Sequence, residues 1–571
     1  MTLLDELNDE QRAAVTAGDG PVMIVAGPGT GKTKTLAARA AWLLEHGAAP
    51  DEILALTFTR KAAGEMRVRA DGLAGAASGG GRPEITTFHA LALRLLDEDA
   101  RAFVDGEERL GIVRGLKRPP ALKALTVREL SLALSNAKNA LMLDDEWAGV
   151  VGQYNTALRE RNKRDFDDVL RGLYELAVRE PARVRRRHVL VDEFQDTNEL
   201  QYELTKLLAG AGGLFVIGDP RQSIYGFRGA SGDVFERFEQ DFPDARKVTL
   251  TLNYRSAPEI VRAGNAVFAD APVQLAAVRP TAGRVRLVET LDEYREAAWI
   301  VSEIEAGVGG IGMLGVGADD PEATGFRDYA VLYRTHRVAA ALVRKLDESG
   351  IPFQIAGEGS PYERTEVRQI VDALTLLAGE TADGDTAGAW LWAELRPLVG
   401  QVAVTELLQR VADQIGGYEE AARQRELGQL LSVATRFGSD AVAAAGYFAA
   451  LRESEYYDPA AEAVTLATIH AAKGLEFEHV FVLGVEDGLL PHQRPGAAVD
   501  SGEEQRLFYV AVTRPKRWLD LVHARTRGGQ SAVVSRFVAP LAPELVTDPG
   551  LARQERKRSA VRAKKAQGRL F

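Results

Sequence analysis

A glycine-rich segment near the start of the chain has the composition of a phosphate-binding loop. Residues 26–33 read AGPGTGKT, an Ala-x-x-x-x-Gly-Lys-Thr pattern that follows the apolar run 21–26. Glycines let backbone N–H groups approach phosphate oxygens, Lys32 can reach the β- and γ-phosphates, and Thr33 can ligate Mg²⁺. A chance turn would not require a strand before the loop and a helix after it. The residues that we assign to ATP in this loop are Ala26, Gly27, Pro28, Gly29, Thr30, Gly31, Lys32, Thr33 and Lys34.

Two adjacent carboxylates suit the other half of an ATP-hydrolysing site. The apolar run HVLV at 188–191 leads directly into Asp192 and Glu193. At the end of a strand, Asp192 can hold Mg²⁺ and Glu193 can orient or deprotonate the attacking water. A solvated acidic turn is the alternative, and the phosphate loop in the same chain makes it the weaker interpretation.

Three further polar residues could act on the γ-phosphate. Gln222, in VIGDPRQSIYGFRG, is a candidate for sensing it. Arg255, in LNYRS, and Arg514, in QRLFYVAVTR, could supply positive charge to the transition state. Lone arginines most often form surface salt bridges, so these assignments depend on the surrounding motifs.

Strands and helices must position these residues, and the apolar pattern indicates an α/β fold. Strand-like runs occur at 21–26, 52–58, 188–194, 214–219, 329–335 and 479–485. Such runs, alternating with helical patterns, are typical of parallel sheets. They form two clusters along the chain, which predicts two doubly wound domains. Stretches rich in Ala, Leu, Glu and Arg between them predict helical insertions in each domain.

The predicted organisation has two interrupted core domains and a tail. We expect a first core domain at 1–96 and 186–276, interrupted by a helical insertion at 97–185. A second core domain should comprise 277–375 and 463–545, interrupted by a reduced helical insertion at 376–462. A basic mobile tail should follow at 546–571. Residues 553–569 of the tail hold eight Lys or Arg against one Glu.

Composition excludes several classes of protein. The chain has no cysteine, which excludes disulfides, thiolate zinc sites and cysteine-ligated iron–sulfur clusters and fits a reducing cytoplasm. No apolar run approaches the length of a membrane span, and the acidic N-terminus lacks a signal-peptide pattern. The net charge of −11 excludes a basic nucleic-acid coat. A local basic groove for nucleic acid stays possible.

The motifs, taken together and in order, resemble superfamily 1 helicases of the UvrD/Rep/PcrA group. The matching segments are 7–11, 27–33, 56–66, 86–96, 191–198, 218–230, 252–256, 350–367, 468–484 and 503–514. The resemblance implies two RecA-like domains that sandwich ATP and movement along single-stranded DNA from 3′ to 5′. It also implies that Gln11 reads adenine, that Arg255 and Arg514 contact the γ-phosphate, and that Glu476 couples the nucleotide to the second domain.

A motor that grips a strand without reading its sequence needs aromatic platforms and phosphate contacts. The DNA-binding candidates in or beside the motif loops are Phe58, Thr59, Thr87, His89, Tyr225, Phe227, Arg228 and His470. Core packing is the alternative for a lone aromatic residue. The matching motif favours a DNA role for Tyr225 and Phe227, although the family usually has Trp at the second position.

Three functions remain to be compared. The first is an ATP-dependent DNA translocase and helicase that acts in DNA repair or replication on single-stranded and tailed duplex DNA. The second is a translocase that removes proteins with little strand separation, which the short stretch 376–462 favours. The third, a non-enzymatic adaptor, conflicts with the retained catalytic residues.

RNA is a weaker alternative to DNA as the strand along which the motor moves. Only 57 residues follow Arg514, so we expect no nuclease domain in this chain.

The chain ends in KKAQGRLF, and Gln567, Leu570 and Phe571 fit a Gln-x-x-Leu-Phe pattern. This pattern resembles the short peptide by which bacterial replication proteins bind the sliding clamp. The glutamine would bond at the rim of a pocket that the two apolar residues fill. The alternatives are a disordered solubilising tail and a basic tail that contacts DNA phosphates.

Overall fold

The structure is a computed structural model that describes most of the chain in two compact units. The described residues are 3–73, 81–96, 103–210, 212–230, 232–309, 325–357, 365–379, 394–415, 427–428, 430–431, 433–452, 457–493 and 500–548. Unit 1 comprises Met1–Gly283 and Ala498–Thr513, and unit 2 comprises Arg284–Ala497 and Arg514–Phe571. The clamp-like residues Gln567, Leu570 and Phe571 lie outside the described residues.

Unit 1 is built on a six-stranded, entirely parallel sheet with the order β3-β2-β4-β5-β1-β6. Its strands are β1 (Val22–Ala26), β2 (Ile53–Thr57), β3 (Glu84–Thr87), β4 (His188–Val191), β5 (Gly213–Gly218) and β6 (Arg246–Leu250). Side chains of β1 alternate between the two faces, so that Ile24 and Met23 belong to different hydrophobic cores. The parallel α/β fold predicted from the apolar runs is confirmed.

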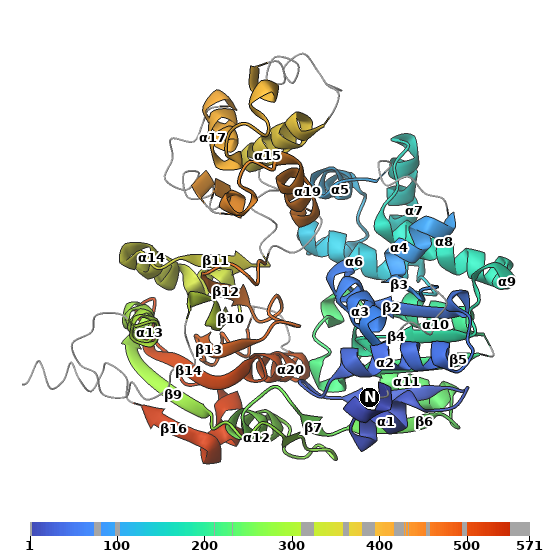
Figure 1. Cartoon of the computed structure of the whole chain (residues 1–571), viewed down its shortest axis with the longest axis horizontal. Coiled ribbons are helices and arrows are strands. Elements are labelled where there is room, and N and C mark those ends of the chain that lie inside the picture. Colours follow the sequence, from blue (N-terminus) through green and yellow to red (C-terminus); the bar gives the residue numbers. More distant parts are fainter. Residues whose placement is uncertain are drawn as a thin grey trace, which may run out of the picture. The chain divides into compact units, whose positions relative to one another are not determined.

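Helices cover both faces of this sheet, as the blue to green ribbons of Figure 1 show. The helices whose residues pack in the core with Ile24 are α1 (Asp9–Val15), α2 (Lys32–Glu45) and α3 (Arg60–Leu73). Those that pack in the core with Met23 are α4 (Phe88–Leu96), α8 (Phe166–Arg179), α10 (Glu199–Ala209) and α11 (Val234–Asp241). The chain continues through β7 (Leu252–Asn253), α12 (Pro258–Val267) and β8 (Ala276–Ala277).

Residues between β3 and β4 form helices with a small core of their own. They are α5 (Gly106–Gly115), α6 (Val127–Asn139) and α7 (Asp145–Glu160), whereas the short helix α9 (Pro181–Val184) joins α8 in the core with Met23. Leu130, Leu134 and Tyr154 are fully buried within this core. Side chains of Asp105, Thr126 and Asp144 cap the first three of these helices, which explains where each begins.

Unit 2 contains a second sheet, with the order β11-β12-β10-β13-β14-β9-β16 and parallel pairing along that path. Its strands are β9 (Arg284–Asp292), β10 (Tyr329–Tyr333), β11 (Phe353–Ala356), β12 (Val464–Thr468), β13 (Phe477–Leu483), β14 (Pro515–Arg527) and β16 (Leu545–Asp548), with β15 (Gln530–Ser531) antiparallel to β14. Helices α13 (Glu293–Gly307) and α14 (Ala340–Ser349) pack on one face of it.

A second group of helices lies between β11 and β12 in the sequence. Its described helices include α15 (Thr365–Ala378), α17 (Val404–Ile415) and α19 (Ala441–Arg452). They share a hydrophobic core that is separate from the core of the sheet. Within the described part of the chain, no helix is long and apolar enough to cross a membrane.

Helix α20 (Ser501–Val512) belongs by its contacts to unit 1, whereas we predicted it within a second core at 463–545. It packs against α12, where Gln505 Nε2 donates to the carbonyl of Val267 at 2.8 Å. Gly264 permits the close approach, because a Cβ there would lie 3.1 Å from Thr513 Cγ2. The chain returns to unit 2 at Arg514.

Candidate functional site

The phosphate loop joins β1 to α2 and depends on two glycines in the left-handed region. Gly29 and Gly31 have φ of 71° and 85°. A Cβ on Gly29 would lie 2.8 Å from both Arg255 Cβ and Asn253 Nδ2, so a larger residue would clash there. Gly31 precedes α2 without a side-chain cap, which leaves the first N–H groups of the helix for an anion. Lys32 Nζ donates to the carbonyls of Ala26 and Gly27 at 3.2 and 3.3 Å.

The acidic pair follows β4, the strand next to β5 in the sheet. Asp192 is buried, and burial, together with the charge of Glu193, raises its pKa to about 7. The positive charge of Lys32 acts on Asp192 in the opposite direction. Glu193 has a φ of 47°, a conformation that non-glycine residues rarely adopt and that occurs at functional turns. Its backbone N–H donates to Asp192 Oδ1 at 2.9 Å.

A chain of hydrogen bonds connects Glu193 to Gln222 through Gln195 and Asp219. Gln195 Nε2 donates to Glu193 Oε2 at 2.5 Å, and Gln195 Oε1 accepts from the backbone N–H of Asp219 at 2.9 Å. Asp219 Oδ2 accepts from Gln222 Nε2 at 2.8 Å. Sequence reasoning missed Gln195. Its position two residues after Glu193, in VDEFQD, was the feature that could have identified it.

Gln11, the predicted adenine-binding residue, lies against the phosphate loop. Its Nε2 donates to the carbonyl of Thr30 at 3.0 Å, and its backbone N–H donates to Asn8 Oδ1 at 2.7 Å. Asn8 Nδ2 in turn donates to the hydroxyl of Tyr254 at 2.7 Å. The N–H of Tyr254 donates to the carbonyl of Gly29, yet 44% of this tyrosine is exposed. Sequence reasoning missed Tyr254, although it stands beside Arg255 in LNYRS.

Lys34, in the first turn of α2, is turned toward the N-terminal segment. Its Nζ donates to the carbonyl of Glu6 at 2.9 Å and lies 3.6 Å from the carboxylate of that residue. Thr33, beside it, is partly buried at the N-terminus of the helix.

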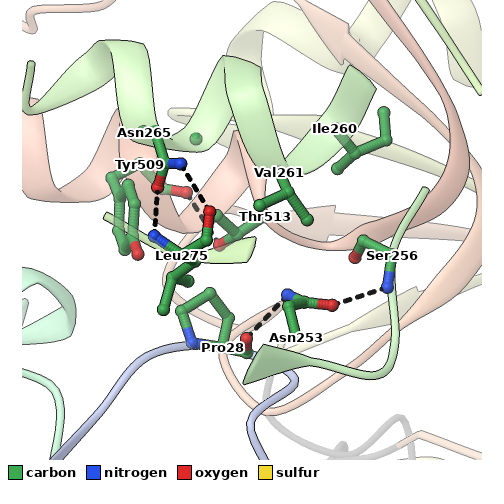
Figure 2. A pocket seen from close by; sticks show the side chains of 10 residues that line it. Pro28, Asn253, Ser256, Ile260, Val261, Asn265, Leu275, Tyr509 and Thr513 are labelled. Carbon is green, nitrogen blue, oxygen red and sulfur yellow. Dashed lines mark hydrogen bonds between the residues drawn. The ribbon is translucent and has the colours of Figure 1, made fainter. Parts of the chain in front are cut away.

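Arg255 lies beside the loop because Asn253 ties the two segments together. Asn253 Nδ2 donates to the carbonyl of Pro28 at 2.8 Å, and its Oδ1 accepts from the N–H of Arg255 at 2.9 Å. A cavity of about 10 Å³, roughly the space of one water, lies behind these residues. Figure 2 shows that Tyr509 and Thr513 line the cavity together with Pro28 and Asn253.

Tyr225 and Phe227 lie together in a loop that follows β5. Their ring centroids are 6.0 Å apart with an interplanar angle of 62°, and 39% of Phe227 is exposed. Arg506 Nε, on α20, donates to the carbonyl of Ser223 at 2.6 Å. The side chain of Arg228 lies outside the described part of the structure.

Four DNA-binding candidates lie at the ends of the neighbouring strands β2 and β3: Phe58 and Thr59 follow β2, Thr87 is the last residue of β3, and His89 follows it. The two threonines cap helices, since Thr59 Oγ1 accepts from the N–H of Ala62 and Thr87 Oγ1 from that of Ala90. These bonds use one acceptor site of each hydroxyl and leave its O–H able to donate to a phosphate oxygen.

Burial lowers the pKa of His89, whereas the charge of Asp167 opposes the shift. His89 also contacts the ring of Phe166 edge-on at 5.9 Å. Phe166 is 48% exposed and stacks on Phe103 at 4.8 Å. It is a further exposed aromatic residue that sequence reasoning missed.

Three predicted site residues lie in unit 2. Arg514 is buried, and its Nη1 donates to the carbonyl of Leu475 at 3.3 Å. Its own carbonyl accepts from the N–H of Phe477 at 3.2 Å, so Arg514 is bonded on both sides of the exposed Glu476. His470 follows β12 and is partly buried.

Comparison with known proteins places this geometry in one family. Residues 7–126 and 120–243 match the model of the UvrD/REP helicase N-terminal domain, and residues 248–385 and 402–526 match that of the UvrD-like helicase C-terminal domain. ATP-dependent DNA helicase UvrD1 of Mycobacterium leprae is 33% identical over 95% of this chain and 86% of its own length. DNA helicase II of Escherichia coli is 31% identical over 96% and 89%, and ATP-dependent DNA helicase PcrA of Bacillus subtilis is 29% identical over 98% and 88%. The chain therefore belongs to the UvrD/REP helicase family, as its motifs predicted.

Proposed function

We propose that this protein is an ATP-dependent DNA helicase that moves along single-stranded DNA from 3′ to 5′ in DNA repair or replication. The observation that carries the proposal is the hydrogen-bond chain from Glu193 through Gln195 and Asp219 to Gln222. It ends in the segment that holds Tyr225 and Phe227 and so connects the candidate hydrolysis residues to the candidate DNA platform. Relatives over nearly the whole chain are named ATP-dependent DNA helicases, which supports the same function.

In this proposal the phosphate loop binds ATP, with Lys32 at the β- and γ-phosphates and Gln11 at the adenine. Tyr254 adds a partly exposed ring that can stack on the base, because it lies between Asn8 and the loop. Residues 26–34 supply the remaining contacts.

The proposed Mg²⁺ ligands are the Thr33 hydroxyl and the Asp192 carboxylate. A buried carboxylate beside a second carboxylate is costly in its charged form, and its raised pKa of about 7 reflects that cost. A nearby divalent cation would remove the penalty, so these residues fit Mg²⁺. When bound with ATP, the metal would neutralise charge on the transferred phosphoryl group.

The hydrolytic step assigns one role to each polar residue. Glu193 accepts the proton of the attacking water, and Gln222 senses the γ-phosphate. Arg255 and Arg514 stabilise charge in the transition state. Glu476, whose neighbours Leu475 and Phe477 bond to Arg514, couples the nucleotide to the second core domain.

The proposed DNA contacts come from the loops after the strands. Tyr225 and Phe227 stack on bases, an interaction worth about 1–3 kcal/mol per base. The proposed supporting contacts are Phe58, Thr59, Thr87, His89, Arg228 and His470.

The division into two core domains with insertions at 97–185 and 376–462 belongs to this proposal, with α20 in the first unit. The proposed site of action is the bacterial cytoplasm, at the nucleoid. The proposed clamp contact by Gln567, Leu570 and Phe571 would be tested by pull-down with the clamp. Equal retention after removal of 567–571 would contradict it.

A translocase that clears proteins from DNA with little strand separation is the second candidate. The alignment with UvrD1 of Mycobacterium leprae spans 687 residues, more than the 571 of this chain, so that relative has segments with no counterpart here. Removal of a protein roadblock from single-stranded DNA without opening of a duplex would favour this candidate.

ATP hydrolysis with and without single-stranded DNA tests the proposal, together with unwinding of duplexes that carry a 3′ or a 5′ tail. We expect strong stimulation and opening of the 3′-tailed duplex, and the Lys32→Ala variant as a control should show neither. Stimulation without opening would indicate the translocase. No stimulation would contradict a DNA motor.

A further inference from the structure

We propose that Asn136, on α6 of the helical insertion, is a positioning residue for the aromatic loop, defined as residues 225–230. The inference rests on the proposed function, in which this loop stacks on DNA bases. Asn136 would hold the loop in the conformation that presents Phe227, and the helical insertion would thereby contribute to the grip on the strand.

The contact joins parts of the chain that are 91 residues apart. Asn136 Nδ2 donates to the backbone carbonyl of Phe227 at 3.0 Å. Gly229, with a φ of 81°, lies against the same side chain, since a Cβ there would be 3.2 Å from Asn136 Oδ1. Asn136 therefore holds the loop at the residue that carries the exposed ring and packs closely beside its left-handed turn.

Backbone bonds within the loop and a contact from outside it act on the same turn. Gly229 N–H donates to the carbonyl of Gly226 at 2.9 Å, and Ala230 N–H to that of Tyr225 at 3.2 Å. Both bonds close the turn on itself. The bond from Asn136 instead ties the turn to a separate helix, which sets the direction of the peptide plane next to the Phe227 ring.

A buried charge cluster fixes the rotation of α6. Lys138, 4% exposed, lies 2.7 Å from Asp165 and 2.6 Å from Asp168, both at the N-terminus of α8. One position further, Asn139 Nδ2 donates to Asp167 Oδ1 at 2.7 Å. Asn139 lies on the α8 side of α6, whereas Asn136, almost one turn earlier, reaches the aromatic loop. A helix held so firmly along one side presents Asn136 in a defined place.

A second helix, α20, contacts the aromatic loop and Ser223, which lies two residues before it. Arg506 of α20 donates to the carbonyl of Ser223, and a Cβ on Gly226 would lie 2.9 Å from Glu503 Oε2. Helices α6 and α20 thus support the same short segment. Loss of the α6 contact should loosen the ring of Phe227 and leave the other support in place.

Two variants separate the hydrogen bond from the shape of the side chain. Asn136→Ala removes the donor, and Asn136→Asp keeps the shape but turns an acceptor toward the Phe227 carbonyl. Leu132→Ala, on the same helix and 38% exposed, is the matched control. Asn136 is not buried in the core, so thermal melting should stay close to that of the parent protein.

The measurement is the concentration of oligo-dT that gives half-maximal stimulation of ATP hydrolysis, made on the full chain. For Asn136→Ala we expect an increase of about fivefold, the net effect of one neutral hydrogen bond, and at least as much for Asn136→Asp. The turnover number at saturating DNA and the rate without DNA should stay within about twofold of the parent values. A purely structural defect would lower those rates as well.

A double-mutant cycle with Phe227→Ala shows whether Asn136 acts through the ring. We expect Asn136→Ala to have little further effect in the Phe227→Ala protein. Fluorescence of DNA that contains 2-aminopurine should report weaker stacking in either single variant. Additive effects of the two substitutions, or an unchanged DNA requirement for Asn136→Ala, would overturn the inference. If Phe227→Ala alone left DNA binding unchanged, the proposed role of the loop would fail instead.

Discussion

Substitution of Gln195 should lower the ATP turnover number of the protein without weakening ATP binding. Gln195 is 1% exposed and donates to the carboxylate of Glu193 at 2.5 Å, while its oxygen accepts from the N–H of Asp219. Glu193 holds an unfavourable backbone conformation and depends on such contacts for its orientation. Gln195 does not bond to the phosphate loop in the structure, so nucleotide affinity should be preserved.

The size of the effect follows from the lost bond. A hydrogen bond to a charged group is worth about 1.5–3 kcal/mol. If the bond orients the base in the transition state, its loss lowers the turnover number about 10- to 100-fold. Gln195→Met keeps the length and removes both polar atoms. Gln195→Glu keeps the acceptor for Asp219 but places a second carboxylate beside Glu193, so it should be at least as slow.

Steady-state ATPase at saturating single-stranded DNA measures the turnover number, and titration of ATP gives KM. We expect KM to change less than about twofold in both variants. The matched control is Gln201→Ala on α10, a buried glutamine whose side chain bonds only near the N-terminus of its own helix. Turnover numbers within twofold of the parent in both Gln195 variants would refute the orienting role. So would equal losses in the Gln195 and control variants.

Three further outcomes are expected. Tyr254→Ala should raise the KM for ATP roughly tenfold through lost stacking, with Tyr254→Phe close to the parent; equal KM values in both would contradict the adenine role. Lys138→Met should lower the free energy of unfolding by about 1.5–3 kcal/mol in urea titrations, because it removes the 2.7 Å ion pair with Asp165 and leaves that buried carboxylate with the longer ion pair to Arg109 at 3.4 Å, and a loss below about 1 kcal/mol would be inconsistent with the pair. Burial raises the pKa of Glu296 to about 7, so the folded protein keeps a proton that the unfolded chain has already released, and stability should fall as pH rises from the ordinary glutamate pKa to about 7. In Glu296→Gln this fall should shrink when melting temperatures are compared from pH 5 to 8, and identical profiles would count against the shift.

The strands that could be predicted from the sequence are those made of uninterrupted apolar residues. Strands β9 and β14 were missed because charged residues interrupt their pattern. In the structure, Arg286 Nε donates to Asp520 Oδ1 at 2.5 Å, and His479 Nε2 lies 2.7 Å from Asp520 Oδ2. Burial alone would raise the pKa of Asp520, but the bonds from Arg286 and His479 hold it well below its ordinary value. Because of such buried ion pairs, the sequence of a buried strand contains charged residues that are typical of an exposed strand.

The placement of α20 shows a second limit of the sequence. Chain order suggests that the helix belongs with the strands on either side of it, β13 and β14. Its contacts with α12 and with the carbonyl of Ser223 group it instead with the first unit. Packing between segments more than 200 residues apart decides this grouping, and no local pattern encodes it.

The sequence by itself predicted the phosphate loop and the acidic pair, and it determined the family. The proposed phosphate chemistry needs glycines, Lys32, Asp192 and Glu193 at fixed positions relative to strand ends, and this pattern is visible without a structure. Only the tertiary structure decided which side chains support them. Gln195 and Asn136 are ordinary residue types, and their proposed roles arise because folding brings Glu193 and the Phe227 carbonyl within hydrogen-bond distance. A hydrogen bond depends on position in space, so its partners become known only when the chain is folded.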